Sequence, residues 1–229
     1  MRTGVNFGMK NNKIIPVKIE TISPVNYYYV PAAGGMRSSD FIGDIALKYA
    51  TLHQLGKLGY QYPTKFQPTY EELASFPFWY TVGISEKLAF GEGKDTIFMK
   101  NMIRNTMQGI DYNGTSSYPG FREGSKMYKN FYFQQPIKPG NVFYSYFITT
   151  EEFLEIPVAL RIGNNKTGIL KLQEYHGHDF KAVINAYTIQ NILGKEIPKL
   201  NYDYSNHTVL QYFLIGMLNK EDLIGIYDT

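Results

Sequence analysis

Residues 38–56, SSDFIGDIALKYATLHQLG, are the stretch from which the fold of this chain can be worked out. Its apolar side chains recur at helical spacing, at Phe41, Ile45, Tyr49 and Leu52. The same spacing turns Asp44 and Lys48 toward water. We therefore predict an amphipathic helix with one buried face.

Signals for both ends of this helix are present. The side chains of Ser38, Ser39 and Asp40 can each accept a hydrogen bond from an N–H group of the first turn. Gly56 or Gly59 can adopt the left-handed conformation that ends a helix. We expect the helix to lie between these residues.

A strand is predicted before the helix. Residues 14–22, IIPVKIETI, alternate apolar and polar side chains until Pro24 interrupts the pattern. A strand, a crossover and a helix in this order open an α+β unit. The fold class is therefore predicted to be α+β.

Two further elements are expected in residues 69–84. Residues 70–75 are predicted to form a short helix, with Thr69 as its N-cap and Glu72 as the capping-box partner. Residues 78–84, FWYTVGI, are typical of a strand because aromatic and β-branched residues fit a pleated surface.

Two hairpins are predicted in the second half of the chain. In residues 129–150, two aromatic segments flank a connection in which Gly140 or Asn141 takes a positive φ. Residues 156–175 repeat this form around a turn near residues 163–168. We expect one domain over residues 1–229, with a β-rich sub-domain within residues 108–175.

Charge is unevenly distributed along the chain. The formal net charge is only +3, yet residues 98–140 hold six basic side chains against two acidic ones. Residues 196–229 hold two basic side chains against five acidic ones. A basic middle fits a phosphate-binding surface, although a patchwork of solvated faces gives a similar distribution.

Aromatic residues make up 16% of the chain, with 20 tyrosines against one tryptophan. Tyrosine suits protein interfaces and platforms on which nucleobases stack. An aromatic-rich sheet also needs such residues for its core. Both uses stay open for any single tyrosine.

Residues 108–126 form the longest stretch without an apolar period, and we predict a long loop there. Its aromatic and cationic side chains stand together, at Tyr118, Phe121, Arg122 and Lys126. Bases stack on rings or guanidinium planes while phosphates bind lysine and arginine, so this pairing favours RNA. The alternative is a surface loop with ordinary solubilising charges.

No catalytic or metal centre is expected. The chain has no cysteine and four histidines, of which His176 and His178 stand close together without a further ligand group at metal-site spacing. No nucleophile motif or paired-carboxylate signature is present. A histidine-dependent ribonuclease needs only one general base, so this class stays open. We expect neither metal nor cofactor.

A cytoplasmic location is expected. No apolar run approaches the roughly 20 residues needed to span a bilayer, and the N-terminal residues lack the apolar centre of a signal peptide. We therefore expect no membrane partner.

The order of several segments resembles the Cas5 family of CRISPR-associated RAMP proteins, and within it the Csc1 subgroup of type I-D interference (Cascade) complexes. The segments that carry the resemblance are SSDFIGDIALKYA at 38–50, YEEL at 70–73, the run from Tyr118 to Lys126, IKPGNVFYSYFITT at 137–150, IPVALRIGNNKTGILKL at 156–172 and AVINAYTIQNI at 182–192. Together they span residues 14–193. Their shared order, rather than any one of them, makes the resemblance.

This resemblance implies a ferredoxin-like, RRM-related core with an appended β-rich sub-domain. It also implies a non-catalytic RNA-binding subunit of a ribonucleoprotein complex in antiviral defence. Such a subunit holds the 5′ handle of the guide RNA and bridges the repeated backbone subunits to the large subunit. A further implied role is help in recognising the DNA motif beside the target.

Loop position and charge indicate the candidate RNA contacts. They are Arg37, Tyr118, Phe121, Arg122, Lys126, Lys129, Arg161 and Lys166. Two alternatives remain: a RAMP endoribonuclease that processes precursor guide RNA through a histidine such as His53, and a tyrosine-rich interaction protein without nucleic acid.

Overall fold

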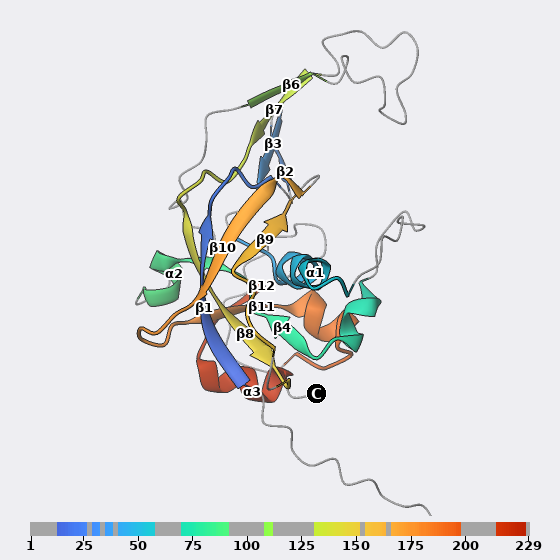
Figure 1. Ribbon diagram of the computed structural model, residues 1–229, viewed down its shortest axis with the longest axis vertical. Helices are drawn as coiled ribbons and strands as arrows, with labels where there is room; N and C mark the ends of the chain where they lie inside the picture. Colours follow the sequence, from blue (N-terminus) through green and yellow to red (C-terminus); the bar gives the residue numbers. More distant parts are fainter. Residues whose placement is uncertain are drawn as a thin grey trace, which may run out of the picture.

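The protein was analysed as a computed structural model. It describes residues 13–26, 29–32, 35–38, 41–57, 70–91, 108–111, 131–151, 154–163, 166–197 and 214–227. Within these ranges helices and strands mix around a curled antiparallel sheet (Figure 1). The predicted α+β class is therefore confirmed.

The main sheet has six strands, with β1 at its centre. The strands are β1 (Lys13–Thr21), β4 (Phe78–Tyr80), β5 (Ile84–Ser85), β8 (Val142–Thr149), β9 (Ala159–Ile162) and β10 (Gly168–Glu174). Their order is β4-β8-β1-β10-β9, and β5 also pairs with β8. Every pair is antiparallel, and these pairings do not confirm the ferredoxin-like detail of the expected core.

One face of the main sheet carries the core. Side chains alternate along β1, so Val17 and Ile19 are fully buried while Lys18 between them is half-buried. Helix α1 (Asp44–Gln54) packs beside β9 and β4. Its buried Ile45 and Leu52 join the same apolar cluster as the strand residues.

Two smaller sheets flank the main one. The first, at the top of Figure 1, has the order β2-β3-β7-β6. Its strands are β2 (Tyr29–Ala32), β3 (Gly35–Ser38), β6 (Gln108–Asp111) and β7 (Phe131–Gln135). The second pairs β11 (Ala182–Asn185) with β12 (Leu214–Leu218).

Short helical segments complete the described chain. They are η1 (Glu71–Ser75), α2 (Glu86–Phe90), the π-helix η4 (Thr188–Ile192) and α3 (Lys220–Tyr227). None of the helices in the described ranges is long and apolar enough to cross a membrane.

The predicted helix exists, but its N-terminus and its solvent face were predicted wrongly. It begins at Asp44 with Gly43 as N-cap, rather than at a cap formed by Ser38, Ser39 or Asp40. Gly56 follows its end with φ 65°, as expected for a left-handed C-terminal glycine. Asp44 and Lys48, expected in water, are both fully buried.

The short helix at η1 also begins differently from the prediction. Its N-cap is Tyr70, with φ 58° and no side-chain capping bond, so the predicted capping box is wrong. The strand predicted for residues 78–84 is confirmed in part, because it forms two short strands, β4 and β5, that are interrupted at residues 81–83.

Only one of the two predicted hairpins forms. β9 and β10 pair as expected, whereas β7 pairs with β3 and β6, and β8 pairs in the main sheet. Gly140 nevertheless takes the predicted positive φ, at 81°. The predicted loop at 108–126 is wrong for its first four residues, which form β6, and its remainder lies outside the described residues.

Candidate nucleic-acid interface

The hairpin formed by β9 and β10 carries two of the candidate cations. Arg161 lies on β9 and Lys166 in the turn, and both side chains are exposed. The N–H of Lys166 donates to the carbonyl of Gly163 at 3.0 Å, which closes the turn. Lys166 has φ 53° and Gly163 has φ 83°, so both residues are in the left-handed region.

The segment that follows β1 holds this turn in place. The hydroxyl of Ser23 donates to the carbonyl of Thr167 at 3.0 Å and accepts the N–H of Ile169 at 2.8 Å. The N–H of Ile22 also donates to the carbonyl of Ile169 at 2.8 Å. These hydrogen bonds fix the side of the turn that leads into β10.

The root of the turn also approaches the strand that contains Arg37. A Cβ atom on Gly163 would lie 2.9 Å from the carbonyl oxygen of Asn26. The Oγ of Ser38 lies 3.2 Å from the Oδ1 of Asn26, within hydrogen-bond distance. Arg37 precedes Ser38 in β3, so the fold brings the backbone of Arg37 close to the β9–β10 turn.

The open face of the main sheet adds two cations that the sequence-based site did not include. Residues opposite each other on neighbouring strands share a face, and Lys171 lies opposite Glu20 and Ala159. Lys18 lies on the same face, two residues before Glu20 in β1, and is opposite Tyr144 of β8. The alternation of apolar and polar residues at 14–22 already indicated this position, because it places Lys18 on the face of the sheet that points away from the buried side chains.

Arg161 belongs to the same face. It lies opposite Ile169, which is two residues before Lys171 in β10. Three cations, Arg161, Lys171 and Lys18, therefore cross three adjacent strands, with Glu20 as an acid among them. We call this set and Lys166 the basic sheet face.

Five candidate residues cannot be placed. Tyr118, Phe121, Arg122, Lys126 and Lys129 lie outside the described residues, so their part in RNA binding stays a prediction. The structure thus brings Arg161 and Lys166 together and places the backbone of Arg37 nearby.

Asp44 and Lys48 are two buried ionisable residues of α1 whose pKa values are strongly shifted. The carboxylate of Asp44 accepts hydrogen bonds from Asn185 at 3.1 Å and Thr188 at 2.5 Å. Burial raises its pKa from 3.8 to about 6, and the hydrogen bonds oppose this shift. Asp44 thereby ties α1 to β11 and η4.

Lys48, one helical turn later, holds the other side of α1. Its Nζ donates to the carbonyl of Phe76 at 2.9 Å and lies 3.2 Å from the centre of the Trp79 ring. Burial lowers its pKa from 10.5 to about 6, while the charge of Asp44 raises it. Full burial keeps both groups from a large substrate, so we assign them a structural role.

The histidines form no metal site in the described chain. His176 and His178 are exposed, and within the described ranges no three acidic, histidine or cysteine side chains could hold a metal ion. His53, the candidate base of a nuclease, is half-buried in the last turn of α1. His207 lies outside the described residues.

The chain matches the model of a known protein family. The family described as type I-D CRISPR-associated protein Cas5/Csc1 matches residues 12–215, which is most of the chain. No curated protein matches the chain at a significant level.

A solved structure shows a weaker likeness. It is a chain in the cryo-EM structure of the type III-B Cmr-beta complex bound to cognate target RNA and AMPPnP. The alignment covers 89% of this chain and 84% of that chain, at 11% sequence identity and a TM-score of 0.40. This score is too low to establish a common fold, so the family match alone identifies the chain.

Proposed function

Because the chain belongs to the type I-D CRISPR-associated Cas5/Csc1 family, we propose that it is a non-catalytic RNA-binding subunit of the type I-D interference complex. It holds the 5′ handle of the guide RNA and bridges the repeated backbone subunits to the large subunit. It also helps to recognise the DNA motif beside the target. The observation that carries this proposal is the family match over residues 12–215.

The basic sheet face supports RNA as the ligand. Arg161 can stack on a base or bind a phosphate through its planar guanidinium, and Lys166 offers a point charge at the turn. The hydrogen bonds from Ser23 hold the turn in position before RNA arrives. A ligand that finds its cations already positioned loses less conformational entropy on binding.

The burial of Asp44 supports a binding role over a catalytic one. A general acid or base must lie within hydrogen-bond reach of the proton that it transfers. Asp44 has an ionisation near neutral pH, but it is fully buried and bonded to Asn185 and Thr188. We therefore propose that the subunit holds RNA without cutting it.

The salt dependence of RNA binding tests this proposal. Each neutralised phosphate of single-stranded RNA contributes a slope of about 0.7 to the plot of log affinity against log salt concentration. The double variant Arg161→Gln/Lys166→Gln should therefore lower the slope by about 1.4 for RNA that carries the 5′ handle. Fluorescence anisotropy between low and moderate salt measures this slope.

Lys13 and Lys87 provide the matched control. Both side chains are exposed, and Lys13 lies at the end of β1 remote from the turn, opposite Thr149. The variant Lys13→Gln/Lys87→Gln removes the same charge and should keep the wild-type slope. Equal slopes for both double variants would remove the β9–β10 turn from the interface. RNA cleavage by the purified chain, lost in His53→Ala, would replace the binding role by a nuclease.

A further inference from the structure

A cavity lies beyond the end of β10 that is remote from the β9–β10 turn. Its volume is about 330 Å³, and its walls come from the end of α2, residues 179–181 and the start of α3. Strand β10 lies between the turn and the cavity. The turn comes before Gly168, the first residue of β10, whereas Tyr175 follows Glu174, the last residue of β10, and contacts Phe90 in the cavity wall. Seven residues of strand span about 20 Å, so this cavity is distinct from the turn.

One wall of the cavity is an aromatic ring fixed by its neighbours. Phe90 packs edge-on against Tyr144 and Phe180, with ring centres 4.8 and 5.8 Å away. Tyr175 contacts it from a third direction, at 5.8 Å. Phe90 is nevertheless 37% exposed, so part of this large apolar ring stays open to a ligand.

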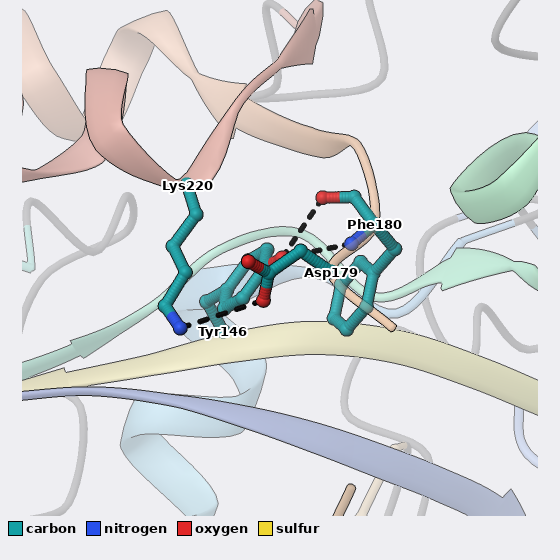
Figure 2. A network of polar contacts seen from close by, with 4 residues as sticks. All are labelled: Tyr146, Asp179, Phe180 and Lys220. Atoms are coloured by element: carbon teal, nitrogen blue, oxygen red, sulfur yellow. Dashed lines mark hydrogen bonds and ion pairs between the residues drawn. The ribbon is translucent and has the colours of Figure 1, made fainter. Parts of the chain in front are cut away.

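Residues 179–181, which also line the cavity, are held by a buried tyrosine. The hydroxyl of Tyr146 donates to the carbonyl of Phe180 at 2.9 Å and accepts its N–H at 3.0 Å (Figure 2). The two rings are stacked with centres 4.2 Å apart. The cavity is therefore formed before any ligand binds.

Two lysines stand at this cavity, each with a replaceable partner. Lys220 pairs with Asp179 at 3.4 Å, and the side chain of Asp179 is 60% exposed (Figure 2). Exposed ion pairs of this kind contribute little stability, so an anion can compete with Asp179. Lys181 donates to the amide oxygen of Asn219 at 2.6 Å, and this partner is neutral.

We propose that this cavity binds a single unstacked nucleotide, with its base against Phe90 and its phosphate at Lys181 and Lys220. Aromatic rings take any base on their faces, and ammonium groups bind phosphate. Asp179, Asn219 and Glu221 line the same cavity and can accept hydrogen bonds from the amino groups of a base. The volume lies at the lower end of the range for ligand sites, as a mononucleotide requires.

The basic sheet face leads toward this cavity. Lys18 lies opposite Tyr144, and the ring of Tyr144 contacts Phe90. The cations Arg161, Lys171 and Lys18 lie on one face of the sheet, and the rings of Tyr144 and Phe90 lie between Lys18 and the cavity. A basic surface beside aromatic rings is typical of proteins that bind a single strand of nucleic acid.

Mononucleotides test the site without the RNA of the proposed function. Saturation-transfer NMR with each of the four ribonucleoside 5′-monophosphates should show transfer from the full-length protein to the base protons. Phe90→Leu should weaken binding about tenfold, because a stacked base loses its aromatic partner. Phe90→Tyr keeps a ring and should bind like the wild type, and Lys181→Gln/Lys220→Gln should weaken binding by a similar factor.

The controls separate this site from the β9–β10 turn. Lys13→Gln/Lys87→Gln and Arg161→Gln/Lys166→Gln should both leave the mononucleotide signal unchanged. Absence of transfer from all four nucleotides, or equal affinity in Phe90→Leu and the wild type, would overturn the inference. Loss of the signal in the turn variant would also overturn it. If a protein segment occupies the surface of Phe90 instead, none of the four nucleotides will show transfer. The salt-slope test of the proposed function does not depend on any of these outcomes.

Discussion

At the scale of single residues, Asp44 and Lys48 determine how α1 is held. Their spacing predicts a solvent-facing pair, yet both lie in the interior. Their partners come from distant parts of the chain, with Thr188 on one side and Trp79 on the other. A helical pattern describes one helix alone, so it cannot show which later segments cover its polar side.

The pH dependence of stability should reflect this pair. Between pH 6 and 10.5 the unfolded chain keeps the proton of Lys48 and the folded chain has released it, so stability rises with pH. Between pH 3.8 and 6 the folded chain keeps the proton of Asp44 and the unfolded chain has released it, so stability falls as pH rises. The combined contribution is therefore lowest near pH 6.

The variant Lys48→Met tests the pH dependence of stability above pH 6. Urea unfolding at pH 6, 7.5 and 9 should show the wild type gaining stability relative to the variant, by at most about 1.4 kcal/mol per pH unit. Lys57→Met changes an exposed lysine and serves as the control. Parallel profiles for the wild type and Lys48→Met would show that Lys48 stays protonated in the folded protein.

At the scale of elements, the β9–β10 hairpin is the best-predicted part of the interface. Its strands and its turn are adjacent in the sequence, so local alternation and turn residues were enough to predict them. The partners of β7 were predicted wrongly because strands β3 and β6 are separated from it by long stretches of chain. Sequence patterns define strands better than they define their partners.

Gly163→Ala tests how tightly the turn is held. An alanine there adopts an unfavourable φ of 83°, and its Cβ meets the carbonyl oxygen of Asn26 at 2.9 Å. We expect a loss of roughly 2–3 kcal/mol in the free energy of unfolding, from backbone strain and the displaced contact. Chemical denaturation measures this loss.

Gly140→Ala is the matched control for this change. Its φ is similar, at 81°, but a Cβ there meets nothing within 4 Å. It should lose only the strain, about 1–2 kcal/mol. Equal losses in the two variants would mean that the contact with Asn26 does not hold the turn.

At the scale of the whole molecule, one sheet has a buried face and a basic face. Its inner face buries Val17 and Ile19 against the core, while its outer face carries Lys18, Lys171 and Arg161. The sequence predicted the α+β class, the family and two of the exposed cations. It could not predict the basic sheet face, because that face exists only where β1, β10 and β9 come together.

Purification of the tagged chain from its native host tests the central claim most directly. Sequencing of the bound RNA and identification of the bound proteins give the result. We expect guide RNAs that share one repeat-derived 5′ end, together with a repeated backbone subunit and a large subunit. A chain recovered without RNA and without these subunits would contradict the proposed role.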